Sequence, residues 1–168
     1  MAYHYFFNLG TNIGQRKLNL SRAVRAIESR FGYFEMSKMV ESRPWGFVSD
    51  NVFCNVAVMV ISDREPLDML AELQQIEKEM SPAPHRHADG SYADRLIDID
   101  IVAVDELQID TPQLQVPHRH LAARRFFLEP MAELAPMWRH PASGLTCAEM
   151  LAQLPEPKDD ENNEQSNH

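Results

Sequence analysis

Cysteine is scarce in this sequence and long hydrophobic runs are missing, and both shortages exclude classes of protein. Cys54 and Cys147 are its two cysteines, far apart and outside any Cys-x-x-Cys pattern. They support neither a disulfide scaffold nor a thiolate zinc site. No apolar run approaches the roughly 18 residues of a membrane span, and the N-terminus lacks the basic and apolar stretches of a secretory signal. We expect a reduced, cytoplasmic protein.

Basic residues are also fewer than acidic residues. The chain carries 16 Lys and Arg residues against 25 Asp and Glu residues, for a formal net charge of −9. Proteins that bind a nucleic acid or an anionic membrane use a surplus of basic side chains. We therefore expect neither nucleic acid nor a membrane as a partner. The 168 residues, 44% of them hydrophobic and 24% charged, fit one ordinary globular domain.

The last part of the chain differs in composition from the rest. Residues 155–168 contain no Val, Leu, Ile, Met, Phe, Tyr or Trp, and hold five acidic residues against one lysine. Such a segment cannot bury enough apolar area to offset the entropy lost on ordering. The sequence predicts a folded domain over residues 1–154 and an acidic, disordered tail over residues 155–168.

Hydrophobic periodicity alternates between strand-like and helix-like along the predicted domain. Apolar residues at helical spacing predict one helix that ends before Gly32 and another that begins at Pro66. The order β-α-β-β-α-β is that of the α+β, ferredoxin-like sandwich, an antiparallel sheet with both helices on one face. The strands are predicted over Tyr3–Leu9, Phe34–Ser42, Val52–Ile61 and Leu96–Val104.

Further elements are predicted after the last of these strands. A turn at Asp105 leads into a short returning strand near Leu107–Ile109, which predicts an additional C-terminal hairpin. Thr146, with Glu149 three residues later, has the capping-box pattern of a final short helix.

The sheet face opposite the two helices would be left to loops. Two connections, 44–51 and 81–95, are long for a compact domain. Long loops in compact domains are usually functional lids or disordered segments. We expect the functional site on this opposite face.

The most specific local pattern is Asp98-Ile99-Asp100 on the last predicted strand. Side chains alternate along a strand, so both carboxylates would lie on one face, about 7 Å apart. Magnesium commonly uses one or two carboxylates and fills its other positions with water and substrate phosphates. The alternative is a solvated strand face paired with Lys or Arg. Arg95, just upstream, is placed to bind a phosphate or a carboxylate.

Two other groups of polar residues carry weaker signals. Gln74 and Glu77 are three residues apart on a predicted helix, a common solvent-facing arrangement. The segments 85–87 and 118–120 both read His-Arg-His. A shared zinc site would need three or four converging ligands, and neither segment lies on a predicted strand. Interleaved His and Arg donors suit a polyphosphate better.

A glycine turn and an aromatic–amide pair complete the candidates. Residues 10–14 join a strand to a helix but match neither the P-loop nor the Gly-x-Gly-x-x-Gly pattern. Phe53 and Asn55 share one face of a predicted strand, which suits stacking on a flat heterocycle and hydrogen bonding to its edge. A core aromatic beside a structural amide is the alternative interpretation.

Four segments, taken in order, resemble one enzyme family. They are similar to the 6-hydroxymethyl-7,8-dihydropterin pyrophosphokinase (HPPK) family of folate biosynthesis. The resemblance extends to about residue 154, so residues 1–154 would form the catalytic domain. The segments are 8–14 (Asn-Leu-Gly-Thr-Asn-Ile-Gly), 95–100 (Arg-Leu-Ile-Asp-Ile-Asp), 116–118 (Val-Pro-His) and 124–130 (Arg-Arg-Phe-Phe-Leu-Glu-Pro).

The resemblance implies transfer of a pyrophosphoryl group from ATP to the hydroxymethyl oxygen of the pterin, with release of AMP. It implies a monomer whose partners are these two small molecules, and two Mg²⁺ ions held by Asp98 and Asp100. The pterin would contact Gly10, Ser42, Pro44, Trp45, Phe53, Asn55 and Phe126. The nucleotide would contact Gln74, Glu77, Tyr92, Arg95, Ile101, His118 and Arg124, and the catalytic residues would be Arg86, Arg95, Asp98 and Asp100.

The sequence departs from the family pattern in the segment 81–95. The family's basic Gly-Arg-x-Arg stretch is absent there, so Arg86 is the best remaining phosphate contact, and Tyr92 takes the place of a tryptophan. This difference leaves a non-catalytic pterin- or nucleotide-binding relic of the same fold as an alternative. An RNA-binding module of the same topology is disfavoured by the net charge of −9.

Overall fold

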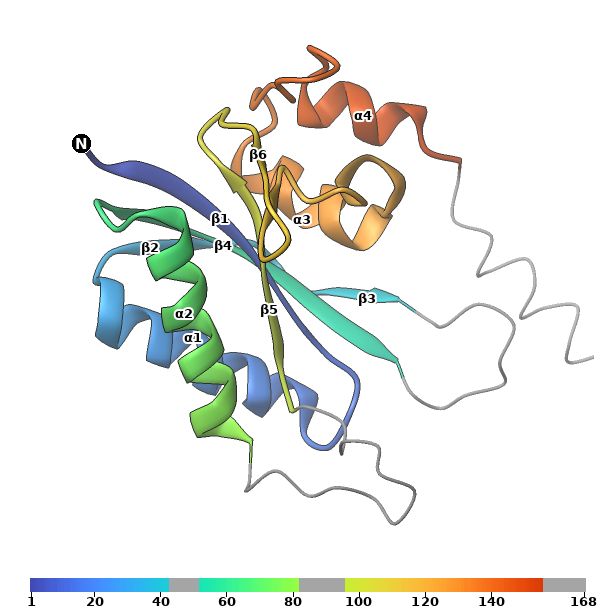
Figure 1. Cartoon of the computed structure of the whole chain (residues 1–168). Coiled ribbons are helices and arrows are strands. Elements are labelled where there is room, and N and C mark those ends of the chain that lie inside the picture. Colours follow the sequence, from blue (N-terminus) through green and yellow to red (C-terminus); the bar gives the residue numbers. More distant parts are fainter. Residues whose placement is uncertain (43–51, 82–95, 156–168) are drawn as a thin grey trace, which may run out of the picture.

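A computed structural model describes residues 1–42, 52–81 and 96–155 of the chain. Its centre is a five-stranded sheet in which β4 and β1 are the inner strands and β5 lies at one edge (Figure 1). All pairings in this sheet are antiparallel, and the order along it is β2-β4-β1-β5. The strands are β1 (Tyr3–Thr11), β2 (Phe34–Met36), β3 (Val40–Ser42), β4 (Phe53–Ser62) and β5 (Asp98–Val104).

The other edge of the sheet is made by two short strands where the sequence predicted one. β2 pairs with one half of β4 and β3 with the other half. The interruption lies at Ser37, whose hydroxyl oxygen accepts a hydrogen bond from the Ala57 N–H at 2.8 Å. This side chain takes the place of a backbone acceptor and interrupts the strand. The prediction of one continuous strand over Phe34–Ser42 is therefore wrong, although its first and last residues are right.

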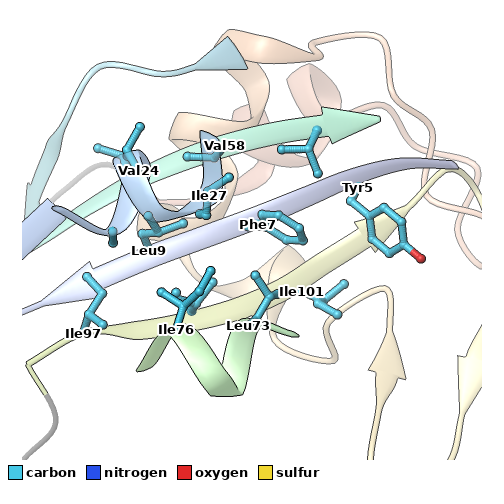
Figure 2. Close-up of a cluster of buried hydrophobic side chains, with 14 of the residues drawn as sticks. Tyr5, Phe7, Leu9, Val24, Ile27, Val58, Leu73, Ile76, Ile97 and Ile101 are labelled. Carbon is cyan, nitrogen blue, oxygen red and sulfur yellow. The ribbon is translucent and has the colours of Figure 1, made fainter. Parts of the chain in front are cut away.

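Two helices, α1 (Arg16–Phe31) and α2 (Pro66–Met80), cover one face of the sheet (Figure 1). Their apolar sides pack on alternate residues of the strands, and Figure 2 shows part of this cluster around Phe7, Leu73 and Ile101. α1 ends where Gly32 adopts a positive φ of 81°, a conformation that favours glycine. The two predicted helices and the face they share are confirmed.

The opposite face is half covered, which corrects the expectation that only loops lie there. Helices α3 (Arg125–Leu134) and α4 (Cys147–Gln153) pack on it. The second core they form contains Phe6, Met59 and Val102 from the sheet and Leu128 and Met131 from α3. The elements between β5 and α3 are the hairpin of β6 (Ile109–Asp110) and β7 (Gln115–Val116) and the short helix η1 (Leu121–Ala123).

The predicted final helix is confirmed, and an additional hairpin follows β5. Its first strand, β6, overlaps the predicted strand only at Ile109 and pairs with β7 in a separate two-stranded sheet, so the prediction of a strand that returns along β5 is wrong. α4 starts with the predicted capping box, in which the Thr146 hydroxyl accepts from the Glu149 N–H at 3.1 Å and the Glu149 carboxylate accepts from the Thr146 N–H at 3.3 Å. Within the described ranges, no helix has the length and apolar character required to cross a membrane.

Candidate active site

The half of the second face beyond the α3–α4 core carries polar side chains from three adjacent strands, of which Asn8 and Asn55 are buried and Asp98 is exposed. The antiparallel register aligns Asp98 of β5 with Gly10 of β1, and Gly10 with Asn55 of β4. The next row on the same face joins Asp100 to Asn8. Register partners in antiparallel strands point to the same side, so the topology gathers residues from distant parts of the sequence at one place.

The two aspartates of β5 lie on the open face, as their spacing predicted. Asp98 is exposed and Asp100 is half-buried, while the intervening Ile99 is buried in the helix-covered core. The residue after Asp100, Ile101, is buried in that same core at 3% exposure. Its side chain is therefore not available to a nucleotide on the open face, and a contact predicted for Ile101 would have to use its backbone.

Glu77 of α2 lies at the edge of the sheet beside this acid pair. Its Oε2 accepts a hydrogen bond from the Ile99 N–H at 3.0 Å, between the two aspartates in sequence. β5 is an edge strand, so this N–H points outward and would otherwise lack a strand partner. Glu77 is buried, whereas Gln74, one turn earlier, is exposed. The solvent-facing alternative therefore applies to Gln74 and not to Glu77.

The glycine at the centre of the site allows a close approach of the neighbouring strand's side chain. A Cβ built on Gly10 would lie 2.7 Å from Oδ1 of Asn55, closer than such atoms pack. Asn55 is 4% exposed, and Phe53, two residues earlier on the same face, is half-buried. Ser42 of β3 is the register partner of Phe53. Four residues predicted to contact a pterin are thus brought together.

The beginning of α3 adds aromatic and cationic side chains to this half of the face. The Phe126 and Phe127 rings meet edge to face, with centroids 4.9 Å apart. The Arg124 guanidinium lies 5.6 Å from both ring centroids, within the range of a cation–π contact. The His118 ring packs edge-on against Phe127 at 4.7 Å, and its backbone N–H donates to Val102 of β5 at 2.8 Å.

His118 is neutral at physiological pH. Burial, and after it the positive charges of Arg124 and of the neighbouring His120 and Arg119, together lower its pKa from 6.5 to about 4. Its Nδ1 accepts a hydrogen bond from the His120 N–H at 3.2 Å, which leaves Nε2 as the nitrogen that carries the proton. The His118 side chain can therefore offer a phosphate oxygen one neutral N–H donor.

Sequence reasoning missed Asn8, which is 2% exposed and lies beside Asp100. Its Nδ2 donates to the backbone carbonyl of Phe126 at 3.0 Å. The signal was present in the sequence, because an amide is unusual in the apolar run of the first strand and a buried amide needs partners. Finding that partner required the fold, since it lies 118 residues away.

Several predicted site residues fall outside the described ranges. These are Pro44 and Trp45 in the first gap, and Arg86, Tyr92 and Arg95 in the second. Their predicted contacts with the pterin and with the phosphates stay predictions.

A shallow cavity of about 610 Å³ lies at the other end of the second face. It is lined by residues from the start of β1 and the segment after β5, and by the loop between α3 and α4. None of the site residues predicted from sequence lines it. The lining residues are His4, Phe6, Asp105, Glu106, Ala135, Pro136, Met137 and Trp138.

The chemistry of the donors on the open face fits magnesium. Among the described residues, no group of three or more His, Cys, Asp or Glu side chains could by itself enclose a metal ion. Magnesium does not need such a cage, because it binds through one or two carboxylates and keeps water and phosphate oxygens as its other ligands. Asp98 and Asp100 supply two carboxylates on one accessible face.

This topology, with an acid pair and aromatic side chains at the open end of the sheet, defines a ferredoxin-like α+β protein suited to a small-molecule site. A family model, 7,8-dihydro-6-hydroxymethylpterin-pyrophosphokinase (HPPK), matches residues 6–136. The 2-amino-4-hydroxy-6-hydroxymethyldihydropteridine pyrophosphokinase of Porphyromonas gingivalis is 36% identical over 138 residues, covering 81% of this chain and 92% of the relative. The Pseudomonas aeruginosa protein of the same name is 33% identical, and the match covers 92% of this chain and 94% of that protein.

A solved structure also matches. The Plasmodium falciparum HPPK-DHPS, in complex with pteroate, superposes with a TM-score of 0.72 at 16% identity, which shows a shared fold. All of this chain is covered, and it spans 44% of the Plasmodium chain.

The chain belongs to the HPPK family. The family resemblance and the ferredoxin-like fold predicted from the sequence are both confirmed, and the family match supports the predicted pyrophosphokinase function in folate synthesis. Members of this family are enzymes that act on small molecules, with ATP as the co-substrate.

Proposed function

We propose that this protein transfers the pyrophosphoryl group of ATP to the hydroxymethyl oxygen of 6-hydroxymethyl-7,8-dihydropterin in a magnesium-dependent reaction. Asp98 and Asp100 hold two magnesium ions against the triphosphate. The pterin stacks between Phe53 and Phe126 and bonds to Asn55. The nucleotide is bound by Gln74, Glu77, Ile101 through its backbone, His118 and Arg124, together with Arg86, Tyr92 and Arg95.

One observation carries this proposal: the register that aligns Asp98, Gly10 and Asn55 across three strands. It brings the carboxylate for the metal on β5 and the amide for the heterocycle on β4 to the two sides of β1, with Gly10 between them. The acceptor hydroxyl of a bound pterin and the triphosphate can then approach each other over Gly10, which adds no side chain of its own between them. Holding two reactants in this way supplies much of the catalysis that a phosphoryl transfer needs.

The other requirement of this transfer is neutralisation of negative charge. When bound, magnesium supplies positive charge to the phosphoryl oxygens. The chain's own contribution is to orient its acid pair, and the hydrogen bond from the Ile99 N–H to Glu77 fixes the strand between the two carboxylates. A protein with net charge −9 can therefore bind ATP, because the metal provides the local positive charge.

The proposal is tested by AMP release from ATP in the presence of magnesium and 6-hydroxymethyl-7,8-dihydropterin. Asp98→Asn should lower the rate by at least about 100-fold, since it removes a charged metal ligand. Asp110→Asn is the matched control, because Asp110 is an exposed strand aspartate on the distant β6–β7 hairpin, and it should keep the wild-type rate.

Two results would count against the proposal. Asp98→Asn turnover near that of Asp110→Asn would remove the assigned metal role. A wild-type protein that binds the pterin without releasing AMP would instead favour the non-catalytic relic, the alternative suggested by the altered segment 81–95.

A further inference from the structure

Helix α3 contains a proline that leaves one of its carbonyl groups without the usual partner. In an α-helix, each carbonyl accepts from the N–H four residues later. Four residues after Phe126 stands Pro130, inside the helix, and proline has no N–H. The Phe126 carbonyl therefore cannot form the usual hydrogen bond with the residue four positions later in the helix.

Asn8 supplies the missing donor from the sheet. Its Nδ2 lies 3.0 Å from the Phe126 carbonyl oxygen, and its side chain is 2% exposed. Asn8 is buried and Phe126 is half-buried, so without the amide this carbonyl would lose its protein donor in a place that water reaches only in part. Leaving a buried polar group unpaired costs more than an ordinary hydrogen bond contributes.

The position of Asn8 connects this bond to the proposed active site. Asn8 lies in the row of the sheet that contains Asp100 on one side and Ala57 on the other. The bond therefore fixes the first turn of α3, and with it the Phe126 backbone, to β1. This strand pairs with β5, which carries the two aspartates. Asn8 therefore connects Phe126, which would bind the pterin, with the acid pair, which would bind magnesium and the triphosphate.

We infer that Asn8 is a positioning residue, which sets where the Phe126 ring lies relative to Asp98 and Asp100. It acts through the Phe126 carbonyl and requires no contact with either substrate. This inference rests on the proposed function, because it takes Phe126 as a pterin contact. Asn8 should thus matter for pterin binding far more than for nucleotide binding.

Asn8→Leu tests the inference, because leucine keeps the volume of the side chain and removes its donor. Pterin affinity is measured by calorimetry with magnesium and a non-hydrolysable ATP analogue, and the affinity for the analogue is measured separately. The pterin Kd should rise about tenfold, the effect of leaving one buried carbonyl unpaired, while the Kd of the analogue changes by less than about twofold. Should Asn8→Leu fail to fold, Asn8→Ala is measured with the same expectations.

Trp138→Phe is the matched control. It removes another side-chain N–H that donates to a backbone carbonyl, from Trp138 Nε1 to Asp105 at 2.6 Å, at the far end of the same face. This variant should lose thermal stability and keep its pterin Kd. If Asn8→Leu also lost stability and kept its pterin Kd, as the control should, the inference would be wrong. Asn8 would then be a purely structural residue.

Pro130→Ala tests the carbonyl itself. Alanine restores an N–H at residue 130, which can serve the Phe126 carbonyl within the helix. In this background Asn8→Leu should raise the pterin Kd by no more than about twofold. A tenfold rise of the pterin Kd in the double variant would contradict the inference. A wild-type protein that binds no pterin would instead refute the proposed function, so the two failures are distinguishable.

Discussion

At the scale of single residues, Phe126 gives the most direct test of pterin binding. Its ring is half-buried and packs against the second core, and stacking of a base on an aromatic side chain is worth about 1–3 kcal/mol. We expect Phe126→Ala to weaken pterin binding by about that amount in calorimetry. Tyr33→Ala removes an aromatic ring that is 69% exposed and should leave the affinity unchanged. Equal affinities of Phe126→Ala and wild type would show that the ring does not stack on the ligand.

His118 gives a test by pH. Its folded pKa of about 4 lies below the ordinary value of 6.5, so the unfolded chain takes up the proton first as the pH falls. The stability that neutral His118 contributes is complete above about pH 6.5 and is lost as the pH falls toward 4.

The difference is measured by denaturant unfolding at pH 7.5 and pH 5. Between these values, wild type should lose about 1 kcal/mol more than His118→Gln, an estimate reduced for the partial exposure of the imidazole. Identical pH dependence in the two proteins would mean that His118 is not held neutral by the fold.

The sequence was most informative about residues whose position depends on local geometry. The shared face of Asp98 and Asp100 follows from strand alternation, and so does that of Phe53 and Asn55. The role of Asn8 could not be predicted in this way, because its partner is a carbonyl freed by a proline in a distant helix.

At the scale of secondary-structure elements, the edge strand β5 depends on a side chain from α2. Glu77→Leu removes the acceptor of the Ile99 N–H, and we expect a loss of about 1–3 kcal/mol in unfolding free energy. Hydrogen exchange of the Ile99 amide, followed by NMR, should be faster in this variant. Glu77→Gln keeps an acceptor oxygen and should protect the amide nearly as well as wild type. Unchanged exchange in Glu77→Leu would show that the strand edge is held by other contacts.

Most of the elements could be predicted from local signals, such as Gly32 after α1, Pro66 at the start of α2 and the capping box at Thr146. Two features could not. The break between β2 and β3 depends on the Ser37 hydroxyl meeting the Ala57 N–H across the sheet. The packing of α3 and α4 over half of the second face depends on tertiary contacts of Phe127, Leu128 and Met150, which periodicity alone does not assign to a face.

At the scale of the whole molecule, we expect the folded, active unit to end near residue 155. A chain that stops at Pro155 loses five acidic residues and one lysine of the sequence, and we expect it to keep wild-type AMP release, melting temperature and monomeric state in light scattering. A chain that stops at Pro136, where the family match ends, should not fold stably, because it lacks the buried Cys147 and Met150 of the second core. A marked loss of activity in the longer chain would show that the segment 156–168 has a function.

The arrangement of the molecule explains why its resemblance to a family was more informative than any single motif. Asp98, Gly10 and Asn55 come from three segments that only the antiparallel register aligns. The Asp98-Ile99-Asp100 pattern is visible in the sequence, but its proximity to Gly10 and Asn55 depends on the order β5-β1-β4 in the sheet.

Above all, we propose that divalent cations bound to Asp98 and Asp100 hold the triphosphate against the pterin. A crystal structure with magnesium, a non-hydrolysable ATP analogue and 6-hydroxymethyl-7,8-dihydropterin tests it most directly. We expect oxygen atoms of both aspartates at about 2.1 Å from magnesium ions that also bind phosphate oxygens. Carboxylates bonded to guanidinium groups instead, with the nucleotide present and no cation between them, would contradict it.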